Sequence, residues 1–184
     1  MEAAATNMRY KTVGPRFLAG WVDGLMLLPL WFLSDYILAQ GIIWLTVVWI
    51  PVFYSALWLY SVIGHAVYGK TVGKHVTKLM VLDNKAETRI GWRQAILRDS
   101  FFILANTLSA ALYVYFAAAE ITEIPSGLQI VVLVLGYSGQ IWFITEIVTC
   151  LSNEKSRALH DFIAGTVVVN TGDKPVFESG LPGH

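Results

Sequence analysis

One apolar stretch, residues 15–38, constrains most strongly what this chain can fold into. It is long enough to cross a bilayer as a helix, which takes roughly 20 mostly apolar residues. Yet it carries Arg16 at its start and Asp23 well inside. The helical rise places Asp23 near the middle of a hydrocarbon core about 30 Å thick, where a carboxylate usually faces the bundle interior and finds a partner. We therefore expect this helix to form the wall of a polar interior.

The composition is that of a membrane protein. Of 184 residues, 55% are hydrophobic and 14% are charged, which is too apolar for an ordinary soluble domain. The formal net charge of +0 gives no general attraction to nucleic acid. The single cysteine excludes an intrachain disulfide. No cleavable signal peptide is evident, so we expect the first apolar stretch to remain as an anchor.

Four stretches of spanning length predict an all-α membrane protein, a four-span transmembrane helical bundle with a small cytoplasmic helix and strand appendage. The expected spans are residues 15–38, 42–64, 96–119 and 128–150. Around them we expect a cytoplasmic arm at 1–14, one membrane domain over 15–170 with a cytoplasmic loop at 65–95, and a flexible tail at 171–184.

The distribution of basic residues predicts the topology. Every lysine and arginine lies in or next to the arm, the 65–98 segment or the tail, whereas the connections at 39–41 and 120–127 have none. By the positive-inside rule, both termini are cytoplasmic in a multi-pass protein of the cell (inner) membrane.

Two segments outside the spans have local patterns of their own. Lys70, Lys74 and Lys78 are spaced by four, which favours a short helix with its lysines on one face, against anionic lipid headgroups. Residues 78–83 and 166–170 are strand-prone, and each follows a glycine-containing short helix. Because each strand would leave an unpaired edge if alone, we expect the two to pair.

Four motifs together resemble the RDD family of small membrane proteins over residues 9–170: VGPRFLAGWVDGLML, GKTVGKHVTKLMVLD, WRQAILRDSF and NEKSRALHDFIAGTVVV. The family is named for one arginine and two aspartates. Arg16 and Asp23 match the first two, and the second aspartate matches Asp161 or Asp99, with Asp161 favoured by its context. The resemblance implies a multi-span helical bundle. Some members are linked to cation/proton exchange, and others serve as partners in membrane assemblies.

The polar residues of the spans are the candidate site. A carboxyl group balanced between burial, which raises its pKa, and a nearby arginine, which lowers it, can exchange a proton for a cation. The candidate ion- and proton-binding residues are Asp23, Glu146, Asp99, Asn106 and Gln140. The candidates for structural ion pairing are Arg16, Asp161 and Arg98.

A structural role explains the same charges equally well. Arg16 could neutralise Asp23 or Asp161 and so lock the chain's end beneath the bundle, as an ionic staple. The two interpretations remain open and are compatible, since one pair can be structural while Glu146 exchanges ions.

The leading functional hypothesis is a small integral membrane transporter that exchanges monovalent cations for protons through buried carboxylates. The alternative is a non-transporting membrane adaptor or assembly partner of another membrane complex. No nucleophile motif sets Ser100 or Ser156 beside a base, so we expect no enzyme, and we expect no metal site or other cofactor. The expected partners are membrane lipids, protons, monovalent cations and a second copy in a homodimer, but no nucleic acid.

Overall fold

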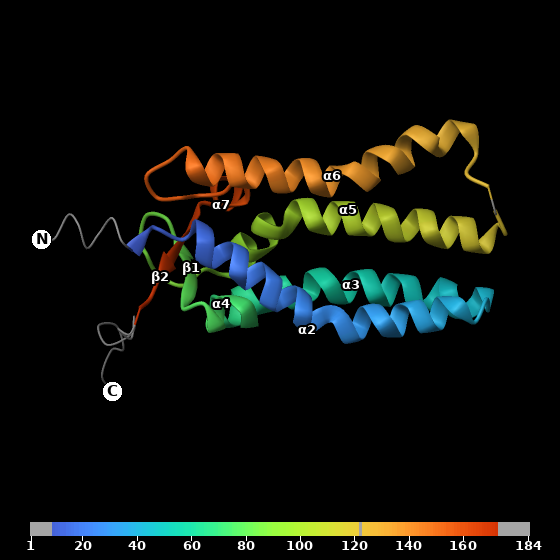
Figure 1. Ribbon diagram of the computed structural model, residues 1–184, viewed down its shortest axis with the longest axis horizontal. Coiled ribbons are helices and arrows are strands. Elements are labelled where there is room, and N and C mark those ends of the chain that lie inside the picture. The colour runs from blue at the N-terminus through green and yellow to red at the C-terminus, as the bar shows by residue number, and fades with distance from the viewer. Residues whose placement is uncertain (1–8, 122, 173–184) are drawn as a thin grey trace, which may run out of the picture.

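Four long helices lie lengthwise beside one another in the computed structural model, which describes residues 9–121 and 123–172 (Figure 1). They are α2 (Val13–Ala39), α3 (Ile43–Tyr68), α5 (Trp92–Ala118) and α6 (Ser126–Leu151). Each is long and apolar enough to cross a membrane, so the prediction of a four-helix membrane bundle is confirmed.

The bounds differ from the expected ones at the loop between α3 and α5. Residues 65–68 continue α3, and residues 92–95 already belong to α5, so the expected loop at 65–95 is shorter at both ends. Most of the expected arm and tail, residues 1–8 and 173–184, lies outside the described residues.

Two short helices and two strands gather at one end of the bundle, called the ribbon end below (Figure 1). Helix α4 (Val72–Val76) and strand β1 (Leu79–Asp83) follow α3, whereas α7 (Leu159–Ala164) and β2 (Thr166–Asn170) follow α6. The strands form an antiparallel two-stranded ribbon whose central pair is Val81 and Val168. The predicted pairing of these two segments is therefore confirmed.

The predicted helix with three lysines on one face is wrong, because local signals confine α4 to five residues. Gly69 ends α3 with φ +69°, a conformation that glycine adopts without strain. The hydroxyl of Thr71 then caps α4 by accepting a hydrogen bond from Lys74 N at 3.4 Å. Lys78 has φ 56° and turns the chain into β1. Lys70 thus precedes α4 and Lys78 follows it.

The two halves of the chain repeat one arrangement. Helices α2 and α3 lead to α4 and β1, and helices α5 and α6 lead to α7 and β2. A residue in the left-handed conformation precedes each strand, Lys78 in the first half and Gly165 in the second. The central strand pair is Val81 and Val168, so the ribbon relates the halves by an approximate two-fold axis. The corresponding seams nevertheless differ: α3 packs along α5, whereas α6 contacts α2 sparsely.

The buried apolar core lies at the ribbon end, since the long helices expose most of their apolar side chains. The ribbon is covered on both faces. One face packs against the spans in a cluster of Ala19, Val62, Leu79, Val81, Ile90, Ala95 and Val168. The other forms a cluster of Tyr10, Met80, Leu82, Val167 and Val169. Because the two strands pair with each other and both faces are covered, the ribbon exposes little surface.

Helix α4 approaches α2 so closely that position 73 must be glycine. A Cβ atom added to Gly73 would lie 2.0 Å from the carbonyl oxygen of Ala19 and 2.8 Å from Cγ of Asp23. The first of these atoms is backbone, so a change of side-chain rotamer cannot relieve the clash.

We therefore expect Gly73→Ala to destabilise the protein by about 1–3 kcal/mol or more, as overpacking does elsewhere. The measurement is thermal unfolding of the purified protein in detergent. Gly24→Ala is the matched control, because a Cβ atom there meets nothing within 4 Å. Equal melting temperatures for the two variants would contradict the close contact.

Candidate functional site

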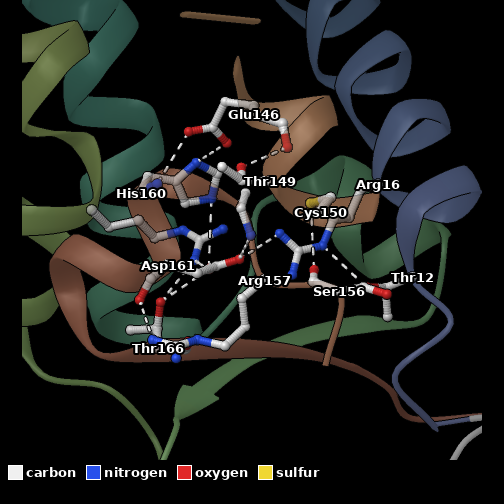
Figure 2. A network of polar contacts seen from close by, with 12 residues as sticks. Thr12, Arg16, Glu146, Thr149, Cys150, Ser156, Arg157, His160, Asp161 and Thr166 are labelled. Carbon is white, nitrogen blue, oxygen red and sulfur yellow. Dashed lines mark hydrogen bonds and ion pairs between the residues drawn. The ribbon is translucent and has the colours of Figure 1, made fainter. Parts of the chain in front are cut away.

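Asp161 is the centre of a buried ionic network at the ribbon end (Figure 2). Its Oδ2 atom lies 2.6 Å from Nη1 of Arg16, and its Oδ1 atom accepts a hydrogen bond from Nη1 of Arg98. The hydroxyl of Thr166 and the backbone N–H of Ala158 each donate to this carboxylate at 3.0 Å. One side chain thereby joins α2, α5, α7 and β2.

The charge of Asp161 is maintained by its arginines. Burial by itself raises the pKa of Asp161, but the guanidinium groups of Arg98 and Arg16 outweigh it and hold the pKa well below its ordinary value. Arg157 adds a third guanidinium group, which donates to the backbone oxygens of Thr166 at 2.9 Å and Asp161 at 3.0 Å. The carboxyl group is therefore ionised at neutral pH.

Asp23 is bound by three donors, one from α3 and two from the N-terminus of α4. It accepts hydrogen bonds from the hydroxyl of Tyr60 at 2.6 Å, the hydroxyl of Thr71 at 2.7 Å and the N–H of Gly73 at 2.7 Å. Its depth estimated from α2 alone therefore does not describe its surroundings, because α4 comes to meet it. The carboxylate lies at the N-terminus of α4, where negative charge is favoured.

Glu146 has the equivalent position at the other short helix. One carboxylate oxygen accepts a hydrogen bond from the backbone N–H of His160 at 3.1 Å, and the other contacts Nδ1 of the same residue. Gly73 and His160 are each the second residue of their helix. A carboxylate from a spanning helix therefore caps each short helix.

Some of these charged groups line one cavity of about 450 Å³ between α2, α5 and α6. Its charged and imidazole lining residues are Arg16, Asp23, Lys74, Arg98, Glu146 and His160, whereas Asp161 and Arg157 lie outside the lining. Its apolar walls come largely from Phe17, Phe102, Trp142, Phe143 and Ile147. Carboxylates from α2 and α6 thus meet in one space, together with a lysine from α4.

The comparison with protein families matches the RDD family over residues 10–165, which is most of the chain. The chain belongs to the RDD family. Together with the four apolar helices, this makes it a membrane protein. No curated protein and no solved structure matches the chain.

The arginine and aspartates that carry the likeness have different partners in this RDD protein. Arg16 binds Asp161, one of the two alternatives left open by the sequence, and Asp23 binds the α4 segment. Asp99 lies apart from the cavity in the seam between α3 and α5, where its Oδ2 is 3.5 Å from Nδ1 of His65. The RDD residues therefore hold the ribbon end to the spans.

The structure does not bring the predicted amide ligands to the carboxylates. Asn106 is half-buried and Gln140 is exposed, and neither lines the cavity that the structure describes. Gln140 and Glu146 are six positions apart, which separates their directions by about 120° around the helix. The amide nitrogen of Gln140 instead donates to the backbone oxygens of Gly136 at 2.7 Å and Tyr137 at 3.1 Å. Among residues 9–121 and 123–172, no group of three or more His, Cys, Asp or Glu side chains could hold a metal ion.

The sequence analysis missed the position of Lys74. It lines the cavity instead of the lipid surface, because the contact of Gly73 with α2 directs the next residue into the bundle. Burial lowers the pKa of Lys74 to about 8, and the charge of Arg98 adds to this effect, while Asp23 opposes it. Headgroup contact stays a prediction for Lys70, which is half-buried, and for Lys78, which is exposed.

Replacing Asp161 should weaken the attachment of the ribbon end to the spanning helices, because the guanidinium groups of Arg16 and Arg98 would lose their buried counter-ion. We expect Asp161→Asn to lower the free energy of unfolding by about 3–5 kcal/mol in thermal or denaturant unfolding. The control is Glu154→Gln, which removes an exposed carboxylate from the α6–α7 connection.

The same pair of proteins gives a test by pH. The pKa of Asp161 is lowered in the folded state, so its contribution is fully present above the unfolded-state pKa of about 3.9 and is lost as pH falls below it. The wild type should therefore lose more stability in acid than Asp161→Asn does. Identical acid dependence of both proteins would contradict the role of this carboxylate.

Proposed function

We propose that this RDD protein is a small transporter that exchanges monovalent cations for protons, and that the cavity between α2 and α6 is its binding site. The observation that carries the proposal is that Asp23, Glu146 and Lys74, from three different elements, line one cavity. By the positive-inside rule, the ribbon end is then the cytoplasmic end in the cell membrane. The proposal involves no enzymatic step.

In this proposal, Lys74 carries the proton and the carboxylates attract the cation. A protonated Lys74 balances the charge of Asp23, whose attraction acts on it. When Lys74 loses its proton, the cavity becomes more negative by one charge, and a monovalent cation restores the balance. Proton and cation therefore compete for one place, which is the requirement for exchange.

The short helices connect this competition to the fold. Asp23 caps α4 and Glu146 caps α7. A cation that binds the oxygens of these two carboxylates therefore competes with the hydrogen bonds that they accept at the two helix N-termini. This assigns the carboxylates a binding role and moves the exchanging proton from the buried carboxylates, where the sequence analysis placed it, to Lys74.

Exchange should rise with pH through a midpoint of about 8, because the share of neutral Lys74 rises there. Arginine stays protonated at every working pH, so Lys74→Arg should lower cation-driven proton release from vesicles at least about tenfold. The measurement is a pH-sensitive dye inside vesicles of purified protein.

Lys85→Arg is the matched control, since it makes the same change at an exposed position beyond β1. Both variants are first compared with the wild type in thermal unfolding. Exchange by Lys74→Arg at the wild-type rate and with the same pH midpoint would refute the role of Lys74.

A second function, as an assembly partner of another membrane protein, is favoured by α6. No side chain is buried in the most apolar window of this fully described helix, and Gln140 is exposed near its centre. Its amide nitrogen donates to backbone oxygens of its own helix, and its amide oxygen is the group that a donor from a neighbouring helix would satisfy.

Under this alternative, Gln140→Leu should reduce the mass of the assembly purified from native membranes in mild detergent. Gln129→Leu is the control, because it makes the same substitution near the beginning of α6. Light scattering measures the mass. An assembly unchanged by Gln140→Leu, or one no larger than the protein itself, would exclude a partner at this position.

A further inference from the structure

The two halves of the chain meet along two helix pairs, called seams here. Helices α3 and α5 pack closely along one seam, whereas α2 and α6 leave the other one open. The approximate two-fold axis relates it to the seam between α3 and α5, where the helices pack along their length. The cavity occupies the open seam. It is lined on α2 by Val13, Gly14, Arg16, Phe17, Gly20 and Asp23, and on α6 by Trp142, Phe143, Glu146, Ile147 and Cys150. These spacings of three and four residues are those of one helix face meeting another.

The cavity reaches the outer surface of the bundle. Phe17 is 54% exposed and Phe143 is 50% exposed, although both line it. Their ring centroids are 6.4 Å apart across the seam. A helix with side chains is about 10 Å across, so another helix does not fit between these rings. An acyl chain is narrow enough to lie beside them.

The groups that line the cavity include more cations than carboxylates. The cations are Arg16, Lys74 and Arg98, and the carboxylates are Asp23 and Glu146. Asp161, which does not line the cavity, binds both arginines, and Arg157 contacts the backbone oxygen of Asp161 outside the lining. Nη2 of Arg16 has no hydrogen-bond partner in the described part of the chain.

The beginning of α2 adds to this charge. Val13 and Gly14 form the first residues of the helix and line the same cavity. The first turn of a helix has N–H groups without intrahelical partners and favours anions. The seam therefore combines an apolar wall with a cationic end.

We propose that the α2–α6 seam binds one anionic phospholipid from the surrounding bilayer, with its phosphate at Arg16 and the first turn of α2 and an acyl chain beside Phe17, Phe143 and Ile147. The cavity volume of about 450 Å³ is within the usual range for small-molecule sites. Anionic lipids are concentrated in the cytoplasmic leaflet, which is the leaflet of the ribbon end under the proposed orientation. The lipid and the proposed ion site share this cavity: the lipid would use Arg16 and the apolar wall, whereas ion exchange would use Lys74 and Asp23.

The test is native mass spectrometry of the purified protein titrated with phosphatidylglycerol, phosphatidylcholine and oleic acid. We expect one retained phosphatidylglycerol, and phosphatidylcholine bound at least about tenfold more weakly. Gly20→Leu fills the seam without changing any charge, since an added Cβ meets nothing within 4 Å. This variant should weaken phosphatidylglycerol binding at least about tenfold.

Gly24→Leu is the matched control, one turn along the same helix and also without a neighbour within 4 Å of an added Cβ. It should bind phosphatidylglycerol like the wild type, and thermal unfolding checks that both variants fold. Equal retention of both phospholipids, or binding unaffected by Gly20→Leu, would overturn the proposal. So would retention of oleic acid alone, or a dimer that Gly20→Leu dissociates.

The proposed transport function is tested separately by the same set of variants. Lys74→Arg should keep the lipid, because it keeps the positive charge at this position of the cavity. A loss of exchange with the lipid retained would therefore support the ion site alone. Gly20 lines the same cavity, so the lipid proposal is judged by the lipid retained in Gly20→Leu and not by the exchange activity of that variant.

Discussion

The buried carboxylate of Asp161 and its two guanidinium partners hold helix α7 to the spanning helices α2 and α5. Arg16 comes from the first spanning helix and Arg98 from the third, so the network connects both halves through a group near the chain's end. A buried charge that loses its partners is far more costly than one that keeps them. This requirement places α7 and the start of β2 beside α2 and α5, while Asp23 and the contact of Gly73 with Ala19 place α4.

The two halves have one architecture but differ in charge where it matters for chemistry. The third residue is Lys74 in α4 and Asp161 in α7. The aspartate gathers arginines into a fixed network, whereas the lysine lies in the cavity with a pKa lowered to about 8 by burial. One half is therefore held by its charges, and the other has a group that can change its charge.

The sequence predicted what depends on local pattern. The four spans follow from length and hydropathy, and the ribbon follows from two strand-prone segments with no other partner. Part of what it missed depends on contacts between distant residues. Lys74 enters the cavity because Gly73 touches Ala19, more than fifty residues earlier in the chain. Gln140 and Glu146 differ in direction by about 120° around α6, which their spacing of six positions already implies, so this prediction failed on helix geometry and not on a distant contact.

The pairing of β1 with β2 has a consequence for biosynthesis. Strand β1 ends at Asp83 and its partner begins at Thr166, after two further spans. During synthesis the first strand therefore leaves the ribosome long before the second exists, and its edge stays unpaired meanwhile. The helices can insert one after another, but the ribbon forms last. The fold is therefore complete only after β2 has been synthesised.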